Sequence, residues 1–243
     1  MSSSSKIIFT GGSGLLGSEF RKIRPDIDYL SSGEFNVTNY DQMKKYVESH
    51  SCDLLIHAAA FTSPPLIEKN PLKALEVNIT GTANVVKLCM EFGIRLIYIS
   101  TDYVFKGDKG NYKETDPVYP VNKYAWSKLG GECAVRMYDK SLIIRTTFGP
   151  NVFPYPKAFI DQWTSRESVA VIAGKIAKLL DKDICGVIHV GGKRKTVYEY
   201  AKILDAAKEI DKLSVNDVGF TVPKDTSLNC EKYNEIIQEG SIE

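Results

Sequence analysis

A tyrosine and a lysine stand four residues apart in the segment Tyr124-Ala-Trp-Ser-Lys128. Four helical residues turn through about 400°, so the two side chains would lie on nearly the same helix face. A phenol with a pKa of about 10 is a poor acid or base at neutral pH, but a neighbouring ammonium group favours the phenolate. The pair could therefore perform general acid–base chemistry, although the spacing alone is common by chance.

Two other segments could serve the same chemistry. A glycine-rich turn, 10–17, follows an apolar run and precedes a helical pattern, as a pyrophosphate-binding loop at a helix N-terminus does. Ser100-Thr101-Asp102 follows the apolar run 96–99, and ligands of open α/β sheets bind beyond the carboxyl ends of strands. The Thr101 hydroxyl could donate to a carbonyl oxygen there. Taken singly, each segment could equally be a structural turn.

The elements that must position these residues are short apolar runs alternating with longer helical patterns. Strands are predicted at 7–10, 54–56, 96–99 and 142–144, and helices at 71–92 and 122–138. Continuous apolar strands are buried on both faces, which is typical of a parallel sheet covered by helices. The predicted fold class is α/β, a doubly wound parallel sheet of the Rossmann type.

The pattern changes after Arg145, where the segment 149–156 is rich in glycine and proline. We predict a dinucleotide-binding domain at 1–150 and a small, trimmed substrate lobe at 151–243. Within the lobe, helices are expected at 166–180, at 196–207 and from Glu231, and a strand at 186–190 could return to the main sheet. The serine-rich segment 2–5 is expected to be a disordered leader.

Composition narrows the class of protein. The 243 residues carry 31 Lys and Arg against 30 Asp and Glu, so the basic surplus that nucleic-acid binding needs is missing. No apolar stretch approaches the roughly 18 residues of a membrane span, and no secretory signal is recognisable. Five scattered cysteines suit free thiols in the cytoplasm. No metal site is predicted, because His50, His57 and His189 lack metal-ligand spacing, and His57 is expected to be a core histidine.

The end of the next predicted strand, at 28–32, bears on the choice of cofactor. No Asp or Glu directly follows Leu30, so the usual partner of a ribose 2′-hydroxyl is missing. Donors at Ser31, Ser32 and Arg21 would suit a 2′-phosphate, which favours NADPH, with NADH also possible. These residues could equally be ordinary surface side chains.

Taken together, the motifs resemble the extended short-chain dehydrogenase/reductase superfamily, and most closely its dTDP-4-dehydrorhamnose reductase family. The resemblance covers about residues 6–240 and is carried by the segments 57–62, 77–82, 100–107, 114–116, 120–132, 145–147 and 186–192. It implies that Thr101, Tyr124 and Lys128 are catalytic. It further implies that the cofactor contacts Gly11, Ser13, Gly14, Leu15, Leu16, Asn36, Val37, Ala60, Thr62, Tyr124 and Lys128, with Ser31 added from the preceding reasoning.

The implied reaction is the reduction of a nucleotide-linked 4-keto-6-deoxy sugar, with Thr101, Asp102, Phe148 and Trp163 facing the substrate. A homodimer is also conceivable. Two departures from the family pattern matter: Phe148 stands where a tryptophan is usual, and only a short link separates Pro150 from the matching stretch at 161–165. The substrate pocket is therefore expected to be trimmed.

Other functions remain open. A 4,6-dehydratase is disfavoured, because Tyr103 rather than Glu follows Asp102, and a fucose-type epimerase-reductase would want a Cys and His pair that the motifs lack. The regulatory subunit of methionine adenosyltransferase resembles the same reductases and binds NADP without catalysis. A non-catalytic NADP-binding subunit is therefore the main alternative.

Overall fold

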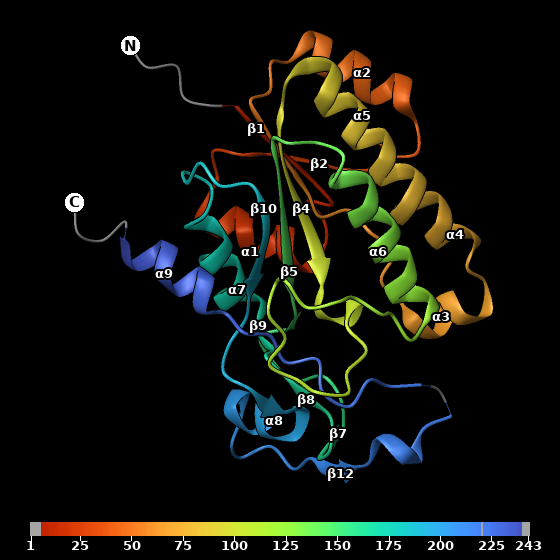
Figure 1. Cartoon of the computed structure of the whole chain (residues 1–243), viewed down its shortest axis with the longest axis vertical. Helices are drawn as coiled ribbons and strands as arrows, with labels where there is room; N and C mark the ends of the chain where they lie inside the picture. The colour runs from red at the N-terminus through yellow and green to blue at the C-terminus, as the bar shows by residue number, and fades with distance from the viewer. Residues whose placement is uncertain (1–5, 220, 240–243) are drawn as a thin grey trace. The chain divides into compact units, whose positions relative to one another are not determined.

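The computed structural model describes residues 6–219 and 221–239 (Figure 1). Its largest sheet has six strands in the order β10-β5-β4-β3-β1-β2, and the pairs β1–β2, β1–β3 and β3–β4 are parallel. The strands are β1 (Ile7–Thr10), β2 (Asp28–Leu30), β3 (Leu54–His57), β4 (Arg95–Thr101), β5 (Ser141–Thr146) and β10 (Gly186–Val190). The predicted α/β class is confirmed, and the run at 186–190 joins this sheet. The predicted leader, 2–5, lies outside the described residues.

The chain divides into two compact units that alternate along the sequence. The first contains residues 6–100, 122–144 and 183–187, and the second contains residues 101–121, 145–182, 188–219 and 221–239. Strands β4, β5 and β10 each contribute residues to both units. The division into a cofactor part and a substrate part at residue 150 remains a prediction about function.

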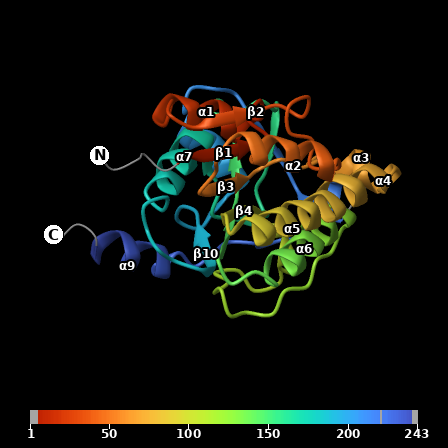
Figure 2. The same ribbon diagram turned by 90° about the horizontal axis from the view of Figure 1, so that it is seen from above.

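Helices cover the strands of the first unit on both faces. Helix α1 lies on one side of these strands, and α2, α5 and α6 form a layer on the other side (Figure 2). Within that layer α2 packs against α5, and α5 packs against α6. The helices of the unit are α1 (Leu15–Ile23), α2 (Tyr40–Ser49), α3 (Pro64–Lys69), α4 (Leu72–Ala74), α5 (Thr82–Phe92) and α6 (Lys123–Val135).

The helix predicted at 71–92 is interrupted by a wide turn. A π-helical segment at Leu75–Gly81 joins α4 to α5, and its residue Asn78 is fully buried. Single π-helical turns within helices are rare and are frequent at functional sites. The apolar periodicity of this stretch predicts a helix. It does not reveal that the hydrogen bonds of the π-helical turn span one residue more than those of an α-helix.

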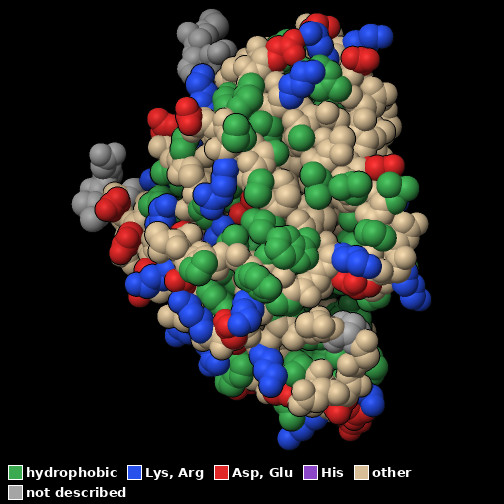
Figure 3. Space-filling model, turned by 45° about the vertical axis from the view of Figure 1, so that its right-hand side comes forward, with side chains coloured by type: hydrophobic (Ala, Val, Ile, Leu, Met, Phe, Trp, Pro, Cys, Tyr) green, Lys and Arg blue, Asp and Glu red, His purple; other side chains and the backbone are tan. Residues whose placement is uncertain are grey.

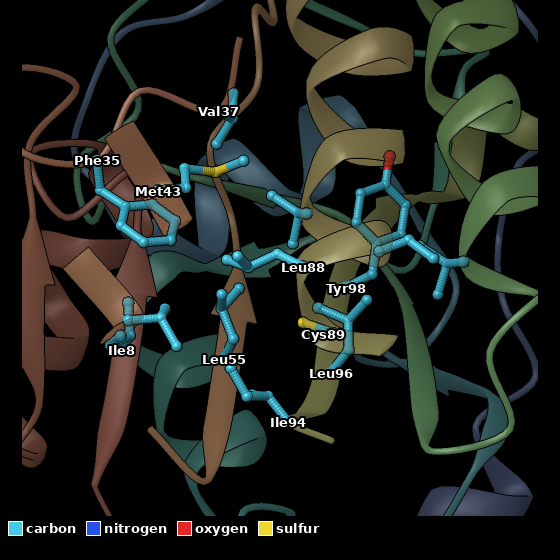
Figure 4. Packing of buried hydrophobic residues seen from close by; sticks show 14 of the residues in the cluster. Ile8, Phe35, Val37, Met43, Leu55, Leu88, Cys89, Ile94, Leu96 and Tyr98 are labelled. Carbon is cyan, nitrogen blue, oxygen red and sulfur yellow. The ribbon is translucent and has the colours of Figure 1, made fainter. Parts of the chain in front are cut away.

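The main core of the first unit fills the space between the sheet and this helical layer. Strand residues Leu55 and Leu96 face Leu88 and Cys89 of α5 across the core, and Met43 of α2 closes one side (Figure 4). All five side chains are inaccessible to solvent. Because this core is continuous from α2 to β4, it fixes the strand ends that carry the candidate site.

The second unit is built from small pieces. Three two-stranded sheets pair β6 with β9, β7 with β12, and β8 with β11. A separate core forms where α8 packs on the rest of this unit. Its residues are Val197, Tyr200 and Ala201 of α8 together with Phe153, Ala158 and Ile210. The elements are β6 (Phe148–Gly149), β7 (Lys157–Phe159), β8 (Trp163–Thr164), β9 (Glu167–Ser168), α7 (Val169–Ala177), β11 (Lys195–Thr196), α8 (Val197–Leu204), β12 (Asp211–Leu213), α9 (Glu231–Glu239) and 3₁₀ turns at Asp102–Val104 and Val215–Asp217.

The predicted lobe helices all occur; the last begins at Glu231 as predicted, and the other two have different bounds. The helix expected from 166 begins at Val169, because Glu167 and Ser168 pair with β6 and the Ser168 side chain caps the helix. The helix expected to reach 207 ends at Leu204. Strand pairing of this kind depends on a distant partner, which local periodicity does not reveal.

One extended segment, residues 224–229, holds the second unit together, and we call it the strap. The Trp163 N–H donates to the Lys224 carbonyl over 2.7 Å, and the Tyr112 N–H donates to the Ser227 carbonyl over 2.9 Å. The residues of the strap from 225 to 229 are buried. The strap therefore joins β8 to the segment around Tyr112, which is far from β8 in sequence.

Candidate active site and cofactor-binding loop

The glycine-rich turn forms a cradle that leaves no room for side chains. Gly11 has a φ of +74°, and a Cβ there would lie 2.8 Å from the Ala59 nitrogen. A Cβ on Gly17 would lie 2.6 Å from the Gly12 carbonyl oxygen. Ser13, Gly14 and Leu15 are exposed at the point where α1 begins, whereas Leu16 is buried in the core. An exposed helix N-terminus behind a close-fitting glycine turn is suited to a pyrophosphate, so the loop fits the predicted dinucleotide.

A buried histidine supports this loop from below. Nδ1 of His57 lies 2.9 Å from Oγ1 of Thr10, and Nε2 lies 3.0 Å from Oγ1 of Thr82. Burial and then the charge of Lys128 lower the pKa of His57 to about 3, so the ring is neutral. His57 thus ties β1 and β3 to α5, which agrees with the expected core histidine. Among the described residues, no three His, Cys, Asp or Glu side chains are grouped as metal ligands.

An acidic residue that sequence reasoning missed stands after β2. Both the N–H and the hydroxyl of Ser31 donate to the Glu34 carboxylate, over 3.0 and 2.7 Å. These bonds lower the pKa of the exposed Glu34 carboxyl. Ser32 is exposed, and the Arg21 guanidinium lies 4.6 Å from the centre of the Tyr29 ring. The available signal was the Ser-x-x-Glu spacing of a capping box, which brings a carboxylate back to the serine N–H.

The remaining predicted cofactor residues occupy two neighbouring segments. The side chain of Asn36 accepts from the N–H and hydroxyl of Thr38, and Val37 is buried. Ala60 is half-buried and Thr62 is exposed. Asn78 holds the segment that contains Ala60 and Thr62. Its side chain accepts from the Phe61 N–H over 2.7 Å and donates to the Phe61 carbonyl over 2.9 Å.

Asn78 also reaches the helix that carries the predicted catalytic pair. Its amide donates to the Ser127 hydroxyl over 2.8 Å, and that hydroxyl donates to the Tyr124 carbonyl over 2.7 Å. A single buried side chain thus links the segment at 58–62 to the first turn of α6. Sequence reasoning did not single out Asn78 as a linking residue.

Tyr124 and Lys128 lie one turn apart on α6, as predicted. Tyr124 is half-buried, while Lys128 is 3% exposed. The Lys128 ammonium group donates to the Ile99 carbonyl over 2.8 Å and lies 4.2 Å from the centre of the Tyr98 ring. Burial lowers the pKa of Lys128 to about 7, and the charge of Glu132 opposes this shift. This lysine is held against the end of β4 rather than in solvent.

Thr101 and Asp102 begin the second unit. The Thr101 hydroxyl donates to Oδ1 of Asp102 over 3.1 Å, and Oδ2 accepts from the hydroxyl of Thr226, in the strap, over 2.6 Å. Burial raises the pKa of Asp102 to about 6, although the Thr226 bond and the Arg166 charge act in the opposite direction. Asp102 therefore anchors the strap, a role that its sequence position does not suggest.

The two aromatic residues predicted to face substrate also belong to the second unit. Phe148 is half-buried in β6, and Trp163 is half-buried in β8. The Arg194 guanidinium lies 3.7 Å from the centre of the Trp163 ring and forms an ion pair with Asp225 of the strap. One face of Trp163 is therefore covered by a cation.

The structure thus sorts the predicted residues into two sets. Tyr124, Lys128 and all the predicted cofactor residues belong to the first unit, whereas Thr101, Asp102, Phe148 and Trp163 belong to the second.

Acidic and basic side chains are intermixed on the face seen in Figure 3. No described helix is long and apolar enough to cross a membrane.

Known proteins are similar to this chain in sequence. The family described as the RmlD substrate binding domain matches residues 5–236. A dTDP-4-dehydrorhamnose reductase of Aggregatibacter actinomycetemcomitans is 32% identical over 180 residues, which cover 70% of this chain and 61% of that reductase. The methionine adenosyltransferase 2 subunit beta of Rattus norvegicus is 26% identical in an alignment of length 281 that covers 96% of this chain and 83% of that subunit.

Two solved structures are similar over nearly the whole chain. A dTDP-4-dehydrorhamnose reductase from Bacillus anthracis, in complex with NADP, has a TM-score of 0.85 and 25% identity and covers 100% of this chain and 99% of its own. A hypothetical dTDP-4-dehydrorhamnose reductase from Sulfolobus tokodaii has a TM-score of 0.85 and 28% identity, covering 95% of this chain and 94% of its own.

Proposed function

Because this chain belongs to the RmlD substrate-binding domain family, we propose that it is an NADPH-dependent reductase of a nucleotide-linked 4-keto-6-deoxy sugar. The observation that carries the proposal is the buried Lys128 one helical turn after Tyr124, with its ammonium group fixed on the Ile99 carbonyl. Similarity to dTDP-4-dehydrorhamnose reductases in sequence and structure supports the substrate class.

In this proposal the Tyr124 phenol donates the proton that the sugar carbonyl oxygen acquires. The bound nicotinamide supplies the hydride for the carbonyl carbon. Lys128 stabilises the phenolate that remains on Tyr124, because a cation in a site of low dielectric acts strongly on a nearby anion. The role of Thr101 in orienting the carbonyl remains a prediction from the sequence.

The cradle at Gly11 and the start of α1 would hold the pyrophosphate of the cofactor. For the choice between cofactors we propose NADPH, which the NADP complex of the Bacillus anthracis relative supports. Ser31 would be a donor to the 2′-phosphate only if it exchanged its bonds to Glu34 for bonds to the phosphate. Glu34 therefore opposes NADPH and would favour NADH.

A second candidate function is a non-catalytic NADP-binding subunit. The similarity to methionine adenosyltransferase 2 subunit beta favours it, since that similarity extends over 96% of this chain. The buried lysine beside the tyrosine speaks against it, because a binding subunit does not need a costly buried cation one turn from a phenol.

The deciding experiment is to follow NADPH oxidation with dTDP-4-dehydrorhamnose and a panel of other nucleotide-linked 4-keto sugars. Turnover of any of these substrates that requires the purified chain supports the reductase. Tight NADPH binding without turnover of any sugar in the panel would contradict the reductase and leave the binding subunit.

A further inference from the structure

A second charged side chain of α6 is buried beside the predicted catalytic pair. Glu132 lies one helical turn beyond Lys128 and is inaccessible to solvent. Its Oε1 accepts from the Ser100 hydroxyl over 2.6 Å. Tyr124, Lys128 and Glu132 therefore follow one another at intervals of four residues.

Lys128 and Glu132 both reach the same point of β4. Lys128 donates to the carbonyl of Ile99, and Glu132 accepts from the side chain of the next residue, Ser100. Gly131 permits this close approach of helix and strand, since a Cβ there would lie 2.5 Å from the Tyr98 hydroxyl oxygen. The two opposite charges are thus anchored on consecutive residues of one strand.

Two other described titratable groups near Lys128 do not provide a negative charge. Tyr98 stays neutral, because burial raises its pKa well above its ordinary value, and His57 is a neutral imidazole. Tyr124 lies one turn earlier on the helix. Among the groups that act on the pKa of Lys128, Glu132 is the one that raises it.

We propose that Glu132 is a positioning residue, the buried counter-charge that keeps Lys128 cationic, and that Ser100 holds this carboxylate in place. A buried ammonium group without an opposite charge releases its proton at a pH below its ordinary pKa. Burial brings the pKa of Lys128 to about 7 even with the Glu132 charge present, so losing that charge would lower the pKa further and reduce the protonated fraction of this lysine at neutral pH. As far as Lys128 acts on Tyr124, the inference rests on the proposed reductase function.

The first test needs no turnover. Urea unfolding is measured for the wild type, Glu132→Gln, Lys128→Met and the double variant, with exposed Glu48→Gln as the matched control. Glu132→Gln keeps an oxygen that accepts from Ser100 and removes only the charge. In the wild-type background it should lower the unfolding midpoint more at pH ~6, where Lys128 is a cation, than at pH ~9.

In the Lys128→Met background the effect should reverse. Glu132 would there be a buried carboxylate without the opposing charge of Lys128, so Glu132→Gln should raise the unfolding midpoint. An equal loss in both backgrounds and at both pH values would overturn the proposal and leave Glu132 a structural residue.

The second test uses turnover, if the reductase proposal holds. Lys128 must be protonated, so the rate falls as pH rises through its pKa. Glu132→Gln should move this alkaline limb to lower pH by about one unit or more, and Glu132→Asp should largely restore its position. A uniform loss of rate with an unmoved limb would contradict the proposal. If no sugar is reduced but the stability coupling is present, the electrostatic coupling of Glu132 to Lys128 stands and the reductase function falls.

Discussion

Ser31 donates to Glu34 twice, from its N–H and from its hydroxyl, at the carboxyl end of β2. The serine proposed to bind a 2′-phosphate is therefore already bonded to a carboxylate. That carboxylate is exposed, and its lowered pKa keeps it ionised at neutral pH.

We expect Glu34→Gln to increase the affinity for NADPH by a few-fold and to change the affinity for NADH less. The variant removes a charge that repels the 2′-phosphate, and the effect should shrink in high salt because the site is exposed. Fluorescence titration of both reduced cofactors at two salt concentrations measures this. An equal change for both cofactors would show that Glu34 does not act on the 2′ position.

Tyr124→Phe separates proton donation from binding. The substitution removes one hydroxyl and keeps the aromatic ring, so kcat should fall by roughly 10²–10⁴ while the Kd of NADPH changes little. Steady-state turnover measures kcat, and cofactor titration measures the Kd of NADPH. A variant that keeps more than a tenth of the wild-type kcat would rule out Tyr124 as the proton donor.

Asp102 makes the stability of the protein depend on pH. Its pKa rises to about 6 on folding, above its usual value of 3.8, so between pH ~4 and ~6 the folded state binds this proton more tightly than the unfolded state. Stability should therefore decrease as pH rises through this window, by up to about 3 kcal/mol from this group.

The Asp102→Asn variant lacks this titration. Urea unfolding of both proteins is measured from pH ~4 to ~7. As pH rises, the free energy of unfolding of the wild type should decrease relative to that of the variant. A difference that is constant with pH would mean that Asp102 titrates alike in the folded and unfolded states.

Asn78→Ala should damage the segment at 58–62. It leaves the N–H and carbonyl of Phe61 without their partner, which we expect to cost about 2–4 kcal/mol, and it should weaken NADPH binding. Ser127→Ala is the matched control, because it removes one bond of Asn78 but leaves both Phe61 bonds. Equal losses for the two variants would place the effect in α6 rather than at Phe61.

The strands and the glycine turn of the first unit could be predicted because their signals are local. Apolar runs of three or four residues and the glycine-rich turn are visible without knowledge of any partner. The Tyr124 and Lys128 spacing likewise depends only on helix geometry. Their catalytic and binding roles, like the homodimer and the cytoplasmic location, remain predictions.

One missed feature is local: Glu34 lies in a turn past the end of β2 and accepts from Ser31, three residues earlier. The other missed features depend on distant residues. The cation over Trp163 comes from Arg194, and the carboxylate of Asp102 is bonded to Thr226, 124 residues away. No periodic pattern relates such pairs, because three-dimensional packing selects them.

The strap also determines when the second unit can form. Pairing of Asp102 with Thr226 and of Tyr112 with Ser227 requires residues that leave the ribosome more than a hundred positions after their partners. Such non-local contacts slow folding, and their unpaired surfaces are open to aggregation while synthesis continues. A nascent chain halted before residue 224 would already contain Tyr124 and Lys128. It could not form the strap contacts of the second unit, to Asp102 and Tyr112.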